Sequence, residues 1–128
     1  MFSYDQTIQP PAPMLDILAS CSKEAESLSV RAILDSGSSL TALPLHTLKA
    51  LNAPVYDRLT ISGYENKKTR ARTYIVAIKV AGHRFWPLEV IGLPRDDAIL
   101  GRDVLNQFII TLDGPSLAFK MHLPERSK

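Results

Sequence analysis

The chain has 128 residues, a length typical of one domain, and its 45% apolar and 22% charged residues are ordinary for a globular protein. A net charge of +2 is too small to indicate nucleic-acid binding or attachment to a membrane surface. The single cysteine, Cys21, excludes an internal disulfide, and no apolar run reaches the roughly 18 residues that a membrane helix needs.

The start of the chain is rich in proline. Residues 1–13 include Pro10, Pro11 and Pro13, and they lack the basic stretch followed by an apolar run that marks a signal peptide. We therefore expect an extended N-terminal arm over 1–13. Cytoplasmic residence is the default expectation, and a soluble domain cut from a longer protein would give the same pattern.

The first part of the expected domain contains a hairpin and a short helix. Alternating apolar residues predict strands at 14–20 and 28–34, and the second strand runs directly into Asp35. Leucines three residues apart predict a helix over 45–51, because Pro44 is favourable in a first helical turn. These elements place a carboxylate at the end of a strand.

The second part alternates strands with turns. Apolar alternation and β-branched residues predict the later strands, which fall at 55–61, 73–80, 85–91, 98–100, 109–112 and 116–121. A polar stretch over 62–72 predicts an exposed hairpin, and a helical pattern covers 102–108. Many short strands with one or two short helices predict an all-β, barrel-like domain over 14–121, with a frayed tail over 122–128.

The tripeptide Asp35-Ser36-Gly37 ends an apolar run. A carboxylate entering apolar surroundings is costly unless it is paired or hydrogen-bonded, so its position at the mouth of a strand indicates chemistry. Asp, Ser and Gly also dominate ordinary turns, and the tripeptide by itself favours that plainer interpretation. The rest of the chain reverses this preference.

A second motif, Ala98-Ile99-Leu100-Gly101-Arg102-Asp103, follows about 65 residues after the tripeptide, with the polar hairpin between them. In this order the features resemble the single-lobe aspartic proteases of the retropepsin type, over roughly 28–117. In that family an Asp-Thr/Ser-Gly triplet carries the catalytic acid, and a hairpin called the flap closes over the substrate. An apolar-apolar-glycine segment passes beside the catalytic loop. The resemblance implies a single-lobe acid-protease β-barrel with a flap hairpin.

The resemblance also assigns roles within the tripeptide. It makes Asp35 the catalytic acid, and it gives Ser36 a hydrogen bond across a dimer that locks two catalytic loops together. Gly37 would let the backbone approach the carboxylate and direct its N–H toward it. All three are therefore candidate catalytic residues.

Candidate substrate contacts follow from the same resemblance. Residues 62–72 would be the flap, with Gly63 as a hinge and Tyr64 as a substrate contact, and Ile99 would lie beside the catalytic loop. This stretch is poorer in glycine and richer in cations than retroviral flaps, which suggests a preference for acidic or extended polar substrates.

The number of triplets bears on assembly. Only one Asp-Ser-Gly triplet occurs here, whereas two-lobed pepsin-like enzymes carry two such triplets. The resemblance therefore implies an aspartic endopeptidase that acts as a homodimer, in which two Asp35 carboxylates activate a water molecule against a peptide or protein substrate without a cofactor. The terminal strands are expected to pair between the subunits at the base of the dimer, which would bury their edges. A catalytically silent peptide-binding or dimerisation module on the same fold is the alternative.

Other charged and polar residues carry plainer interpretations. His46, His83 and His122 have no metal-ligand spacing, so no metal is expected. The cations over 67–72 are not interleaved with aromatic residues, which favours an exposed hairpin over a nucleic-acid patch. Arg102 and Asp103 are expected to act structurally, and the resemblance implies that Arg102 braces the catalytic loop or pairs across the dimer.

Overall fold

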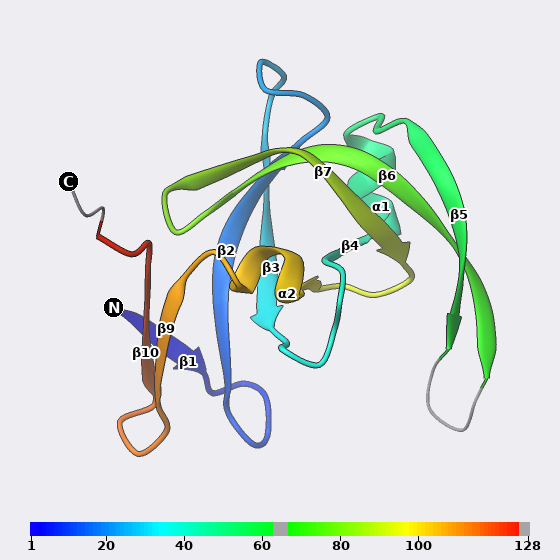
Figure 1. Ribbon diagram of the computed structural model, residues 1–128. Coiled ribbons are helices and arrows are strands. Elements are labelled where there is room, and N and C mark those ends of the chain that lie inside the picture. The colour runs from blue at the N-terminus through cyan, green and yellow to red at the C-terminus, as the bar shows by residue number, and fades with distance from the viewer. Residues whose placement is uncertain (63–66, 126–128) are drawn as a thin grey trace.

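The structure is a computed structural model that describes residues 1–62 and 67–125 (Figure 1). In these ranges the strands are β1 (Phe2–Asp5), β2 (Ala12–Ser20), β3 (Leu28–Leu34), β4 (Ala42–Pro44), β5 (Val55–Ser62), β6 (Lys68–Val80), β7 (His83–Leu93), β8 (Ala98–Leu100), β9 (Ile109–Asp113) and β10 (Ala118–His122). The helices are α1 (Leu45–Ala50) and α2 (Arg102–Leu105). The predicted all-β class with short helices is confirmed. Within the described ranges, neither helix has the length and apolar character needed to cross a membrane.

The strands form one sheet in the order β5-β6-β7-β4-β8-β3-β2-β1-β10-β9. An additional pairing of β6 with β2 curls this sheet back on itself. β8 runs parallel to β3 on one side and antiparallel to β4 on the other. This arrangement brings the end of β3 close to the start of α2, although the two are far apart in the sequence (Figure 1).

The core fills the inside of the curled sheet. Alternation along β2 turns Leu15 and Ile17 inward, and alternation along β6 does the same for Val76 and Ile78. Full burial of each such side chain stabilises the fold by about 1.5–3 kcal/mol. The core thus fixes β2 and β6, and through them the strands that carry the candidate site.

The N-terminal segment is part of the sheet. The sequence predicts an extended arm over 1–13, and in the structure these residues contribute β1 and the start of β2. Phe2 lies opposite Phe119 of β10, and their rings stack with centroids 5.1 Å apart. Hydrogen bonds from Thr7, and then the charge of Arg31, lower the pKa of Asp5 at the end of β1. The chain start is therefore held between β2 and β10.

β5 and β6 form a long antiparallel hairpin that projects from the rest of the sheet (Figure 1). The sequence predicts an exposed hairpin over 62–72, and strand pairing extends into this stretch as far as Ser62 and Lys68. Strand β6 is consequently longer than the predicted strand at 73–80, because a paired backbone tolerates a run of exposed polar side chains.

Candidate active site

Asp35 lies immediately after β3. The last residues of β3, Ile33 and Leu34, pair with Ile99 and Leu100 of β8. The Asp35 N–H donates a hydrogen bond to the Leu100 carbonyl at 3.0 Å, so β8 still holds the backbone at the point where β3 has ended. The residue is half-buried, which leaves part of it accessible.

Residues 35–41 connect β3 to β4, and we call them the catalytic loop after the role that the sequence predicts for Asp35. The loop turns back onto the carboxylate. The Gly37 N–H donates to Asp35 Oδ1 at 2.9 Å, and the Ser38 N–H donates to the Asp35 carbonyl at 3.1 Å. A Cβ on Gly37 would lie 3.1 Å from the same carboxylate oxygen, so glycine permits this close approach. The backbone therefore fixes the orientation of one carboxylate oxygen.

Arg102, the first residue of α2, braces this loop. Its Nη1 donates to the Ser36 carbonyl at 2.8 Å, and its backbone N–H donates to the Ser38 carbonyl at 2.8 Å. The sequence suggests two roles for Arg102, and these hydrogen bonds correspond to the first, which is to brace the catalytic loop.

Thr41 and Asp103 form a hydrogen-bond network behind the loop. The Asp103 carboxylate accepts from the Thr41 N–H at 3.0 Å, from Thr41 Oγ1 at 2.8 Å and from the Val104 N–H at 2.9 Å. Thr41 Oγ1 in turn accepts from the Gly101 N–H at 3.1 Å. Because the network ties the residue before β4 to α2, it holds the far end of the catalytic loop in place.

Replacing Thr41 by Val is expected to lower the free energy of unfolding by about 2–3 kcal/mol, because it leaves the buried Gly101 N–H without an acceptor and Asp103 with one donor fewer. Thr73 is the matched control, since it is equally buried and its Oγ1 has no hydrogen-bond partner among the described residues. Thr73→Val should be neutral or slightly stabilising. Urea unfolding measures both values, and equal losses would contradict the role of Thr41.

A sequence profile of the family described as aspartyl protease matches residues 24–104, a range that contains the catalytic loop, β8 and most of α2. The chain belongs to the aspartyl protease family. No curated protein matches the chain.

Three solved structures share the fold of this aspartyl protease family member. The EIAV protease, solved with the inhibitor HBY-793, is 21% identical, with 74% of this chain and 86% of that chain covered and a TM-score of 0.61. The simian foamy virus (mac) protease is 21% identical, with 72% and 92% covered and a TM-score of 0.52. A retropepsin-like aspartic protease from Rickettsia conorii is 15% identical, with 95% and 89% covered and a TM-score of 0.61. The predicted single-lobe, retropepsin-like fold is thereby confirmed.

Four of the six candidate site residues lie on the catalytic loop or on the strand that pairs beside it. The three candidate catalytic residues are consecutive on the catalytic loop: Asp35, Ser36 and Gly37. Ile99 lies in β8 opposite Ile33, and it is half-buried between the buried residues Ala98 and Leu100. Because side chains alternate along a strand, the Ile99 side chain projects from the face of β8 opposite to that of Ala98 and Leu100. Gly63 and Tyr64 lie outside the described residues.

Sequence reasoning missed Thr41. The one sequence feature that could have pointed to it is its position directly before the apolar residues of β4. A hydroxyl buried at such a position needs a hydrogen-bond partner. The partner, Asp103, is 62 residues away, and sequence reasoning gave Asp103 only an unspecified structural role.

A cavity of about 370 Å³ adjoins the catalytic loop. Leu34 and Ser36 line it on the loop side, and Phe108, Ile110 and Leu112 line it on the β9 side. In residues 1–62 and 67–125, no three His, Cys, Asp or Glu side chains gather as metal ligands would. The loop itself supplies one oriented carboxylate, which can exchange a proton with a water molecule, beside an open surface lined by both polar and apolar groups.

Proposed function

We propose that the protein is an aspartic endopeptidase whose active unit is a homodimer. The observation that carries this proposal is the catalytic loop, in which the Gly37 N–H orients the Asp35 carboxylate in a chain of the aspartyl protease family. The sequence contains one Asp-Ser-Gly triplet, so the second carboxylate comes from the same loop of another copy.

The chemistry requires two carboxylates a few ångströms apart, which share a single proton because both cannot be charged cheaply. The charged Asp35 takes a proton from a water molecule whose oxygen attacks the peptide carbon, while the protonated Asp35 of the partner subunit donates its proton to the carbonyl oxygen. As the tetrahedral intermediate collapses, one of its two hydroxyl groups returns a proton to the carboxylate of the partner's Asp35. The C–N bond breaks, and the leaving amine takes the proton held by the first Asp35, so the pair again holds one proton. Because the pair must hold one proton, the rate should be highest on the acidic side of neutrality.

The free edge of β9 is a suitable place for the interface between the two subunits. β9 is the last strand of the sheet, and its Ile109 and Leu112 are 47% and 57% exposed. An open edge of this kind can pair with a strand of another chain. The sequence led us to expect that terminal strands pair between subunits. Because the terminal strands β1 and β10 are both paired on two sides within the chain, we assign that pairing to β9, which follows them at the edge of the sheet.

The cavity beside the catalytic loop supports the same location. Leu112 of β9 and Ser36 of the catalytic loop both line it, so an interface that begins at β9 would extend to the loop. A two-fold axis at this surface would place the two catalytic loops near each other.

We expect the specific activity to rise with protein concentration as the dimer forms. Analytical ultracentrifugation, run beside cleavage of a peptide library at the same concentrations, tests this expectation. Leu112→Lys should weaken dimerisation by at least about tenfold, or ~1.4 kcal/mol. Leu18→Lys, at a 42% exposed position in β2, is the control and should leave dimerisation unchanged. A monomer whose specific activity is independent of concentration would rule out the homodimer.

A further inference from the structure

Four cations share one face of the β5–β6 hairpin. Directly opposite residues of paired strands point to the same side, and so do alternate residues of one strand. Arg58 lies opposite Arg72, and Arg70 and Lys68 follow at alternate positions of β6. We call these four exposed residues the cationic ladder: Arg58, Lys68, Arg70 and Arg72.

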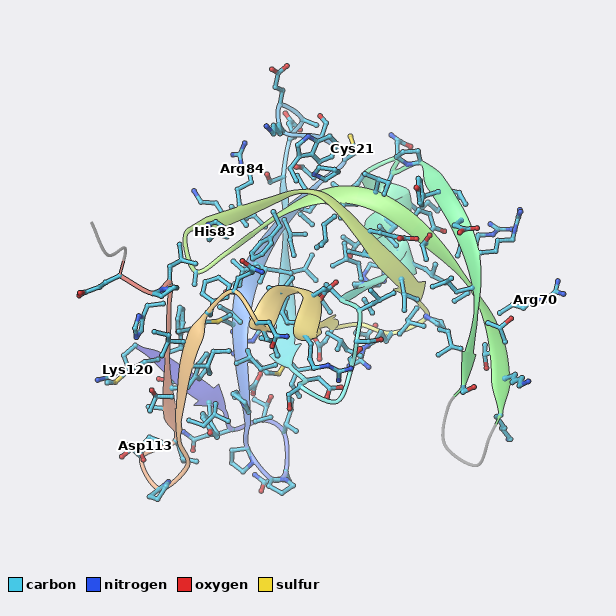
Figure 2. The ribbon with its side chains drawn as sticks, in the orientation of Figure 1. Cys21, Arg70, His83, Arg84, Asp113 and Lys120 are labelled. Carbon is cyan, nitrogen blue, oxygen red and sulfur yellow. The ribbon has the colours of Figure 1, made fainter. Side chains whose placement is uncertain are left out.

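The opposite face of the hairpin is more apolar and partly buried. Leu59 lies opposite Ala71 on that face. Thr73, the next residue of β6 on the same face, is fully buried. Figure 2 shows the Arg70 side chain extending away from the rest of the chain. The cationic ladder therefore lies on the more exposed face of this part of the hairpin, and the preference for acidic or extended polar substrates that the sequence suggests for this stretch would act on that face.

Among the described residues, no salt bridge balances the charge of the ladder. Both salt bridges found among the described residues involve Arg31 of β3. Residues 49–74 contain six of the 15 Lys and Arg residues but two of the 13 Asp and Glu residues, a net charge of +4, and the rest of the chain sums to −2. Like charges directly opposite each other, as in the pair of Arg58 and Arg72, destabilise a hairpin. An anionic partner would relieve this repulsion.

The ladder ends at an open cavity of about 480 Å³ between β6 and α1. Arg72 lines this cavity together with Lys49 of α1, which adds a fifth cation to the surface. The same cavity is also lined by the apolar side chains of Leu45 and Leu48 and by the ring of Tyr74. The cavity can therefore accept an apolar side chain next to two positive charges.

We propose that the cationic ladder and this cavity form an exosite for an acidic, extended polypeptide segment that has an apolar residue at one end. Alternate side chains of an extended segment repeat every ~6.6 Å, which is also the spacing of Lys68, Arg70 and Arg72 along β6. The apolar residue would occupy the cavity. A peptide fits better than a nucleic acid, because no ladder residue is aromatic and bases have nothing to stack on along it. The exosite rests on the proposed function, since it would recruit protein substrates to the peptidase.

The test measures binding directly by fluorescence anisotropy. The probe is a labelled peptide of one leucine followed by alternating glutamate and serine, and its counterpart carries glutamine in place of glutamate. A single-stranded oligonucleotide of equal charge is the third probe. The protein carries Asp35→Asn so that no peptide is cut during the measurement.

Arg70→Glu should weaken binding of the glutamate peptide about tenfold, because it removes one attraction and adds one repulsion. Lys79→Glu is the matched control, since Lys79 is exposed at the other end of β6 and the charge change is the same. It should alter binding less than about twofold. Arg70→Gln, which only removes the charge, should give about a threefold loss. Raising the salt from about 0.05 M to 0.5 M should weaken wild-type binding.

Tighter binding of the glutamate peptide than of the glutamine peptide, with a loss specific to the Arg70 variants, supports the exosite. Equal binding of the two peptides, or an equal loss with Lys79→Glu, overturns it. Tighter binding of the oligonucleotide also overturns it and assigns the ladder to nucleic acid. Because the readout is binding by a protein that does not need to cleave, its failure is distinguishable from a failure of the proposed peptidase activity.

Discussion

Replacing Asp35 by Asn is expected to reduce peptide cleavage by at least about a thousandfold while the fold stays intact. Asparagine cannot take a proton from water, and positioned acid–base groups typically contribute about 10²–10⁴-fold to a rate. One substitution removes both carboxylates of the proposed homodimer. The fold should be unaffected, because the asparagine oxygen can still accept the Gly37 N–H bond that the carboxylate accepts at 2.9 Å.

The measurement is kcat/KM on a cleavable peptide, with thermal unfolding to confirm that stability is unchanged. Asp96→Asn is the matched control, because it removes the same charge from an exposed loop residue and should keep full activity. Cleavage that persists in the Asp35→Asn protein would show that the catalytic assignment is wrong. A wild-type protein that binds peptides but cleaves none between about pH 4 and pH 7 would favour the silent binding module.

Local sequence patterns predicted several elements of the fold, including the two strands that meet beside Asp35. The alternating run that ends at Asp35 predicted β3, the leucine spacing after Pro44 predicted α1, and the apolar run before Gly101 predicted β8. These patterns are reliable because each element buries one face, and burial imposes a period on the apolar residues. The resemblance to retropepsins added the expectation that β8 passes beside Asp35, and the structure pairs β8 with β3.

Long-range contacts were beyond the reach of such patterns. The hydrogen bonds between Thr41 and Asp103 depend on how β4 and α2 are placed relative to each other. The spacing of apolar residues along the sequence carries no information about that placement. The orientation of the hairpin cations depends on the register of β5 against β6, which places Arg58 opposite Arg72. A one-residue shift of register would have turned these cations to the other face.

The N-terminal segment illustrates the same limit. Its prolines indicated an extended backbone, and β1 is extended, but pairing with β10 brings together residues more than a hundred positions apart. Through this pairing Phe2 stacks on the buried Phe119. Nothing near Phe2 in the sequence identifies that partner.

Gly101→Ala is expected to be strongly destabilising, by about 3 kcal/mol or more, because the new methyl group has no space. A Cβ at this position would lie 2.6 Å from both the carbonyl carbon and the oxygen of Leu40, and 2.9 Å from the Ser38 oxygen. These are backbone atoms of the catalytic loop, so they cannot rotate away as a side chain would. Urea unfolding measures the loss, and Gly114→Ala is the control because a Cβ there meets nothing within 4 Å.

Relief of this clash requires the catalytic loop to move away from α2. Such a movement would lengthen the 2.8 Å bond from the Arg102 N–H to the Ser38 carbonyl and the 3.1 Å bond from the Gly101 N–H to Thr41 Oγ1. Activity should therefore fall together with stability in Gly101→Ala, whereas Asp35→Asn should lose activity alone. If Gly101→Ala were as stable as Gly114→Ala, the loop would have to yield freely at this contact, and a yielding loop could not hold the Asp35 carboxylate in one orientation.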